Sequence, residues 1–165
     1  MKNHVSYRFL PLLLVAAVVG CQQQPSQPAA SWEVISESDM TPALQDQLDR
    51  AEAARQALFS SLKERLMEVA GDEGPVAAIE VCSQEAPEIA AKVSQEHQLK
   101  IGRTSFRLRN PDNQPPQWAT DLVADHVEQP TYLVRDGKLA VLHPIHLQAE
   151  CLLCHGPQES LLPSV

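Results

Sequence analysis

Residues 149–156, AECLLCHG, hold two cysteines three positions apart and a histidine directly after the second. Thiols at this spacing lie about one helical turn apart, so each can add to a vinyl group at the edge of a haem, and the next residue then lies beneath the iron. Cys151, Cys154 and His155 therefore predict the covalent attachment of one c-type haem, with His155 as the proximal iron ligand. The chain has four cysteines and six histidines in 165 residues, so a chance occurrence of this pattern is rare.

Paired cysteines also occur in zinc sites and in redox-active disulfides. A structural zinc ion takes four ligands, commonly from two paired clusters, and this sequence has no second Cys-x-x-Cys pair. A thioredoxin-like redox pair belongs to a βαβ unit, whereas the motif here follows a predicted hairpin. In a third alternative, a structural lipoprotein without haem, Cys151 and Cys154 would form a small disulfide.

The second axial position of the iron needs another donor. Cys82 falls on an apolar helix face and lacks an evident disulfide partner, and an unpaired thiol in an oxidising compartment has to be buried or ligated. A buried, inert thiol explains the same pattern. His143 and His146 precede the motif closely enough for a local loop to bring either to the iron. The choice stays open among all residues with a suitable donor, which are Met40, Met67, Cys82, His97, His126, His143 and His146.

The N-terminus indicates the compartment. A basic start with Lys2 and Arg8 is followed by an apolar run too short to span a bilayer, as in a signal peptide. The run ends in VVGC, which is typical of a bacterial lipobox, so we expect residues 1–20 to be removed and Cys21 to receive lipid. Two acyl chains anchor a protein firmly, and Gln22 is no inner-membrane retention signal. We expect a periplasm-facing lipoprotein of the bacterial envelope, with the outer membrane favoured; the alternatives are an ordinary cleaved signal and a buried core segment.

Charge and length narrow the class of protein. Removal of residues 1–20 takes away two basic residues and no acidic one, so the formal charge changes from −8 to −10 over the remaining 145 residues. That length suits one domain with a substantial core. An acidic chain with 4% aromatic residues argues against binding to nucleic acid, and its charge would suit a basic redox partner.

Helices are expected first along the chain. Residues 21–40, polar and rich in proline at their start, predict a lipidated N-terminus and a flexible tether, with the folded domain over 41–165. Thr41 can cap a long amphipathic helix, which the GDEGP stretch at 71–75 ends. A second helix is expected from about Pro75, with a kink or break at Pro87, one turn beyond Cys82.

Strands are expected mainly in the second half. Partial alternation predicts a strand over 99–108, and a short helix follows near Trp118. Two β-rich runs flank Asp136-Gly137, a pair that favours a type I′ hairpin turn. Helices followed by strands indicate an α+β domain.

Three stretches together resemble the PAS-like haem c domain family: AIEVCSQEAPEIA (78–90), IGRTSFRLRNPDNQP (101–115) with the nearby tryptophan, and CLLCHG (151–156). Domains of this family occur alone or as the extracytoplasmic sensor part of histidine kinases. The resemblance covers roughly residues 42–165. It implies a PAS-like antiparallel sheet flanked by N-terminal helices, and one covalent haem whose axial ligands are His155 and Cys82.

The resemblance has one departure. In the family, a further stretch that completes the sheet usually follows the haem motif, whereas this sequence ends at PQESLLPSV (157–165). We therefore expect a shortened C-terminus, either in a fragment or in a domain that lacks its last sheet strands.

Arg103, Arg107 and Arg109 alternate along the predicted strand and would share one face, with Phe106 and Leu108 on the other. A solvated sheet face is one interpretation. The other is that one arginine binds a haem propionate through a charge-assisted hydrogen bond. Arg103 is the leading candidate, because it lies inside the family-like stretch.

A haem with imidazole and thiolate ligands would be six-coordinate, low-spin and of low potential, because a thiolate stabilises ferric iron. With both axial positions filled, we expect no oxygenase or peroxidase chemistry and a protein that is not an enzyme. Electron transfer with a redox partner is the predicted function. The alternative is a redox or small-gas sensor, in which reduction weakens the iron–sulfur bond and a separate signalling protein receives the signal.

Overall fold

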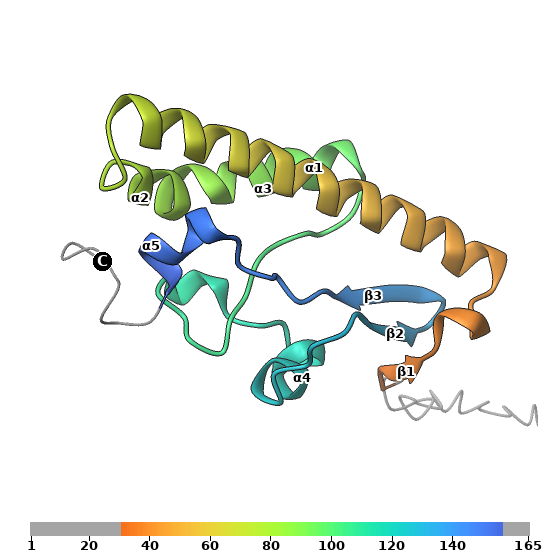
Figure 1. The fold of residues 1–165 in the computed structure, drawn as a ribbon. Helices are drawn as coiled ribbons and strands as arrows, with labels where there is room; N and C mark the ends of the chain where they lie inside the picture. The colour runs from red at the N-terminus through yellow and green to blue at the C-terminus, as the bar shows by residue number, and fades with distance from the viewer. Residues whose placement is uncertain (1–30, 157–165) are drawn as a thin grey trace, which may run out of the picture.

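The computed structural model describes residues 31–156. The predicted signal peptide, the predicted lipid attachment at Cys21 and residues 157–165 lie outside the described residues. Two long helical segments run side by side as one layer (Figure 1). A small sheet and the short helix that carries the cysteine motif lie on one side of this layer. Cys82 and the motif therefore come from different parts of the fold.

The helix α1 (Pro42–Asp72) is the longest element and begins where Thr41 predicts it. The Leu44 amide donates to Thr41 Oγ1 at 3.3 Å, which gives a partner to one of the amides that a helix start leaves free. Gly74, with a φ of +92°, reverses the chain after the helix. The face that α1 buries contains Leu44, Leu48, Ala54, Leu58 and Val69.

The second helical segment runs back along α1 in three pieces without a loop between them. These are α2 (Ala78–Glu80), the π-helical η2 (Val81–Glu85) and α3 (Ala86–Glu96). The irregularity lies at Cys82 itself, one turn earlier than the predicted kink. The wider π-helical turn inserts a residue ahead of Pro87, whose ring would clash with the preceding turn of an α-helix.

Two clusters of buried side chains join this segment to α1. One cluster is formed by Ala54, Leu58 and Val93. The other is formed by Val69, Ala78 and Val81, and Val81 is only 1% exposed. The second cluster therefore packs the π-helical η2 against α1, and Cys82 directly follows the buried Val81.

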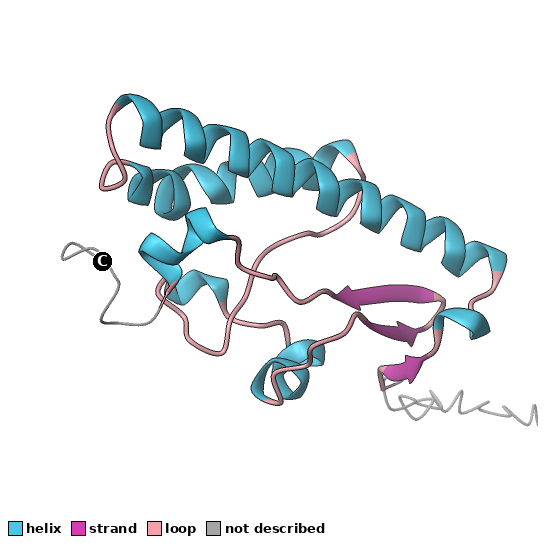
Figure 2. Ribbon diagram, in the orientation of Figure 1, coloured by secondary structure: helices cyan, strands magenta, loops and turns pink. Residues whose placement is uncertain are grey.

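The sheet has three antiparallel strands among the described residues (Figure 2). They are β1 (Glu33–Ile35), β2 (Thr131–Arg135) and β3 (Lys138–Leu142), in that order across the sheet. The predicted β2–β3 hairpin is confirmed: Asp136 and Gly137 have φ values of +51° and +71°, as a type I′ turn requires.

The strand β1 corrects the prediction of a tether throughout residues 21–40. It pairs with β2, and the Trp32 ring before it lies 4.5 Å from the Arg135 guanidinium and 6.0 Å from the Trp118 ring. The folded part thus begins before the predicted boundary at residue 41. A strand of three residues is too short to show a periodic pattern in sequence.

Residues 99–108 form no strand, contrary to the prediction. A strand needs a neighbour that shares its main-chain hydrogen bonds, and no described strand pairs with this segment. The chain instead folds back on the end of α3, where the Ser94 carbonyl accepts from the Leu99 amide and Ser94 Oγ accepts from the Ile101 amide.

Helices and a small antiparallel sheet make an α+β fold, as predicted, and the arrangement is compatible with a PAS-like domain. The predicted short helix is present as η4 (Gln117–Ala119) and α4 (Thr120–Ala124). Gln47 connects α1 to the hairpin, donating to the Gly137 carbonyl at 2.9 Å and accepting from the Leu139 amide at 3.0 Å. Within residues 31–156, no helix is both long and apolar enough to cross a bilayer.

Candidate functional site

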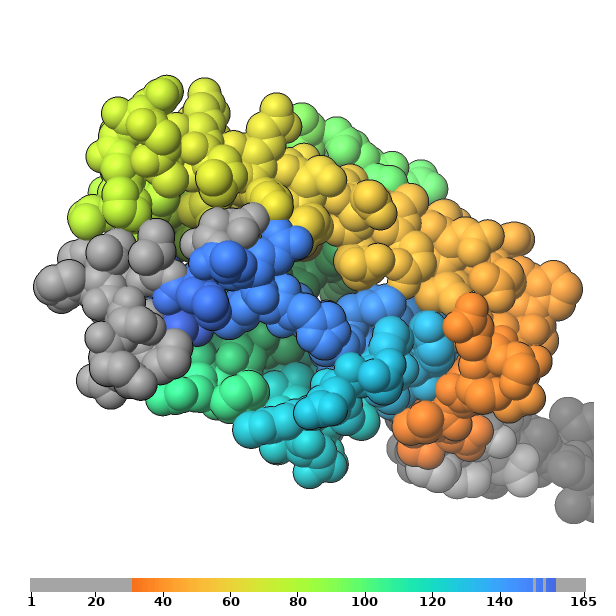
Figure 3. All heavy atoms as spheres, viewed as in Figure 1, coloured from red at the N-terminus to blue at the C-terminus, as the bar shows by residue number. Residues whose placement is uncertain are grey.

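The Cys-x-x-Cys-His motif spans two short helices, η5 (Ala149–Cys151) and α5 (Leu152–His155). Gln148, the residue before η5, is bound to α1: Lys63 Nζ donates a hydrogen bond to Gln148 Oε1 at 2.6 Å. In Figure 3 this segment lies at the surface, between the helical layer and the loop that follows α3. The two thiols stand one helical turn apart, which is the spacing that attachment to the two vinyl groups of a haem requires.

Cys82, half-buried in η2, faces the motif from the helical layer. Burial is the main effect on the pKa of its thiol and raises it, the nearby Arg103 guanidinium acts in the opposite direction, and Cys154 and Cys151 raise the pKa further. These interactions bring the predicted distal ligand and the two attachment cysteines into one region. All three cysteines are free thiols.

His155 is the last residue of α5. Partial burial and the positive charges of Arg109 and Arg103 lower the pKa of its imidazole below the ordinary value of 6.5. The ring is therefore neutral at pH 7. A neutral imidazole is the form that binds a metal ion.

The three arginines do not share one face, because the predicted strand does not form. Arg103 and Arg109 both lie near enough to His155 to lower the pKa of its imidazole, although Arg109 is exposed, as is Arg107. Arg103 Nη2 donates to the main-chain carbonyl of Cys82 at 3.3 Å. Arg109 is thus a second positive charge at the motif, and binding of a haem propionate by Arg103 stays a prediction.

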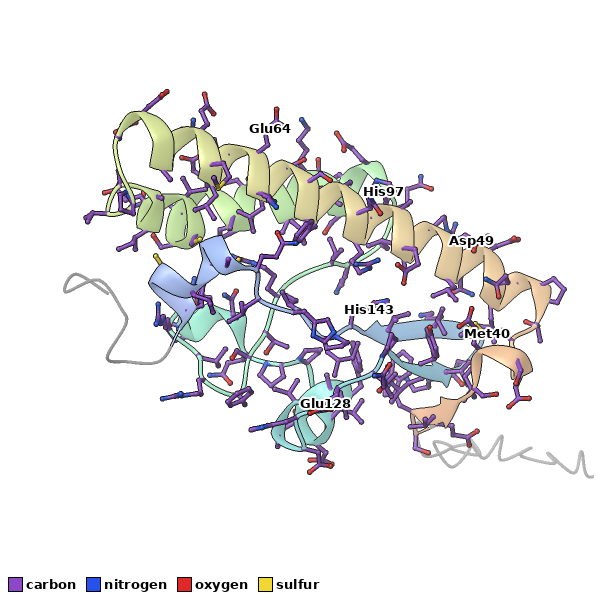
Figure 4. All side chains as sticks on the ribbon, viewed as in Figure 1. Met40, Asp49, Glu64, His97, Glu128 and His143 are labelled. Carbon is purple, nitrogen blue, oxygen red and sulfur yellow. The ribbon has the colours of Figure 1, made fainter. Side chains whose placement is uncertain are left out.

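The other candidate donors are engaged or placed elsewhere. His143 contacts Glu52 on α1 with 2.5 Å between nitrogen and oxygen, and the His126 ring stacks on Phe106 with 3.8 Å between centroids. Figure 4 shows three of the candidate donors, Met40, His97 and His143, at positions well away from α5. Met67 and His146 are exposed. Among the described donors, Cys82 is the one whose pKa is raised by both motif cysteines, which places it near them.

The surroundings of the motif fit a large, flat and mostly apolar group. Ile145, Leu147 and Leu152, close to the motif in the sequence, are 59%, 48% and 43% exposed, so apolar surface is available near the motif. Thr104 Oγ1, next to Arg103, is buried and has no hydrogen-bond partner among the described residues. Within residues 31–156, no three His, Cys, Asp or Glu side chains are placed to hold a metal ion together, so the cysteines there do not form a complete zinc site.

A comparison with protein-family models decides the family. The Tll0287-like model matches residues 26–164, which is most of the chain. This chain belongs to the Tll0287-like family. It is the PAS-like haem c domain family that the three sequence stretches resemble, and membership is consistent with haem c binding. No curated protein and no solved structure matches the chain.

Two features of this Tll0287-like site have no signal in the local sequence. The contact between Lys63 and Gln148 joins residues 85 positions apart, and no local pattern marks a contact at that separation. The unpartnered hydroxyl of Thr104 depends on how a loop packs, which sequence does not show. The π-helical turn at Cys82 has a signal in Pro87, although a proline at this position predicts a kink one turn later.

Proposed function

We propose that this Tll0287-like protein carries one covalently attached haem c, with His155 and Cys82 as the axial iron ligands, and that it acts in electron transfer. The proposal rests mainly on the position of Cys82, which lies near enough to Cys151 and Cys154 for both to raise the pKa of its thiol although it comes from the helical layer of the fold. Family membership and the apolar surface beside the motif support the same assignment.

Each residue of the site has a separate role. The thiols of Cys151 and Cys154 each add sulfur and hydrogen across one vinyl double bond, so two thioether bonds form and nothing leaves. His155 is available as a neutral imidazole, and Cys82 lies close to both motif cysteines as a protonated thiol that would lose its proton on binding the iron. When bound, the haem supplies one-electron transfer between ferric and ferrous iron. With both axial positions taken by protein side chains, the protein is not an enzyme in this proposal.

We propose the bacterial envelope as the location, with the protein facing the periplasm as a lipoprotein and the outer membrane favoured. The support comes from sequence: the signal-like residues 1–20, Cys21 at the end of the apolar run, and Gln22 after it. The formal charge of −10 after removal of residues 1–20 suits a basic redox partner, because opposite charges accelerate encounter.

A redox or small-gas sensor is the second candidate. It is favoured by the π-helical turn at Cys82, because such rare turns are found at functional sites and a ligand on one can be released when the turn rearranges. In this candidate, Cys82 would take up a proton and leave the reduced haem, a gas could then bind the haem in its place, and a separate signalling protein would respond.

Carbon monoxide added to the reduced holoprotein distinguishes the two candidates. Electron transfer predicts an unchanged absorption spectrum, because Cys82 keeps its position on the ferrous iron. A rapid spectral shift would instead assign the protein to sensing. A redox titration of the same sample should show a single one-electron transition at low potential, as thiolate ligation requires.

A further inference from the structure

The main-chain carbonyl of Cys82 has no donor within its own helix. In an α-helix it would accept from the amide of residue 86, and in a π-helix from the amide of residue 87. The Ala86 amide donates to the Val81 carbonyl instead, and Pro87 has no N–H. A partly buried carbonyl without a donor destabilises a fold, so this group needs a partner from outside the helix.

Arg103 supplies that partner. Its Nη2 donates to the Cys82 carbonyl oxygen at 3.3 Å, from the loop that follows α3. The guanidinium is also close enough to the Cys82 sulfur to lower the pKa of the thiol, against the larger effect of burial. One cation thus acts on the main chain and on the side chain of the same residue.

We propose that Arg103 is the positioning residue for the distal ligand: its hydrogen bond to the Cys82 carbonyl replaces the donor that Pro87 lacks and holds the π-helical turn so that the Cys82 sulfur faces the iron. The inference rests on the proposed ligation by His155 and Cys82. It differs from the expectation that Arg103 binds a haem propionate, because Arg103 acts here through Cys82 and not through the cofactor.

The relation between Pro87 and Arg103 allows a direct test. In a Pro87→Ala variant, residue 87 regains an amide that can donate to the Cys82 carbonyl, so Arg103 is no longer needed there. Arg103→Gln should raise the apparent affinity of the ferric holoprotein for cyanide, which competes with Cys82 for the iron, by about tenfold, the effect of losing one charge-assisted hydrogen bond. The same substitution in the Pro87→Ala background should change the apparent affinity for cyanide by less than about threefold.

Hydrogen exchange of the amides in η2 gives a readout that does not depend on the haem. Arg103→Gln should accelerate exchange over residues 83–86 by about tenfold in the wild-type background, and much less in the Pro87→Ala background. Arg107→Gln is the matched control, because it removes an exposed arginine of the same loop that makes no contact with Cys82 in the described structure, and both readouts should stay at wild-type values.

Equal effects of Arg103→Gln in the two backgrounds would overturn the proposal and would assign Arg103 to the cofactor. If Arg103→Gln yields no folded protein, recovery of folding in the Pro87→Ala background supports the proposal, and no recovery overturns it. A wild-type spectrum without thiolate ligation would remove the proposed function instead. The exchange data on the same samples would still decide whether Arg103 holds the turn.

Discussion

Cys82 in η2 and Cys154 in α5 lie close enough, across the boundary between the helical layer and the C-terminal segment, for Cys154 to raise the pKa of the Cys82 thiol. The helix α1 supports both sides of this pair. Lys63 holds the residue before η5, and Arg65, half a turn further on, binds Glu85 in η2 with two hydrogen bonds of 2.7 Å and 3.1 Å. One stretch of α1 therefore fixes the separation between the proposed distal ligand and the attachment motif.

Replacement of Cys82 tests its role as the distal ligand. Cys82→Ala should leave the haem attached, because attachment needs only the motif cysteines, but should change it to a high-spin form or to a form ligated by another histidine. Cys82→His should raise the midpoint potential, since a neutral imidazole stabilises ferric iron less than a thiolate does. Absorption and electron paramagnetic resonance spectra measure both effects.

Ser83→Ala is the control for these variants, because Ser83 is the exposed neighbour of Cys82 and its hydroxyl bonds only to the Glu80 carbonyl in the described structure. Its spectra should match the wild type. If Cys82→Ala also matches the wild type in absorption and spin state, Cys82 is a packing residue.

Core packing beneath the π-helical turn gives a second prediction. Val81→Ala should lower the free energy of unfolding by about 2 kcal/mol, from the lost methyl groups and the cavity they leave. The substitution should also alter the absorption spectrum of the haem, because Val81 directly precedes Cys82, the proposed iron ligand. Val93→Ala, at a position of the other cluster that is only 3% exposed, should lower the free energy of unfolding by a similar amount and leave the absorption spectrum unchanged. The same spectrum in both variants would show that the turn does not depend on this contact.

The ion pair between Arg65 and Glu85 predicts a pH dependence. Hydrogen bonds from Arg65 lower the pKa of the Glu85 carboxyl below its ordinary value of 4.5. A lowered pKa in the folded state adds stability that is present above the unfolded pKa and is lost as the pH falls through the folded pKa. Denaturant unfolding of the wild type and of Glu85→Gln should therefore differ at pH 7 and converge below pH 4.5.

Glu64→Gln removes the same charge from an exposed position of α1 and serves as the control. Its unfolding free energy should stay close to that of the wild type at both pH values. A difference between wild type and Glu85→Gln that persists unchanged in acid would contradict the assignment of this stability to the ion pair.

The parts of the fold that follow from local chemistry were predictable from the sequence. Thr41 and Pro42 mark the start of α1, and Asp136-Gly137 marks the hairpin, because a cap or a turn is determined by the residues that form it. The strand expected over 99–108 was wrong, since a strand depends on a neighbour that may lie anywhere in the chain, and alternation alone does not supply one.

The candidate site was predictable to a similar extent. The motif residues follow from their spacing, and the choice of Cys82 followed from the family resemblance. The arrangement of the arginines did not follow, because it was derived from the strand that is absent. That Arg103 binds the Cys82 carbonyl depends on a donor missing at Pro87 and on a contact between residues 21 positions apart.

Covalent attachment of haem is tested by the mass of the intact mature protein, produced in a host with cytochrome c maturation machinery. We predict a coloured protein whose mass is increased by one haem, and a Cys151→Ala, Cys154→Ala double variant that has lost this increase. Colourless wild-type protein, with these two thiols free or joined in a disulfide, would contradict it.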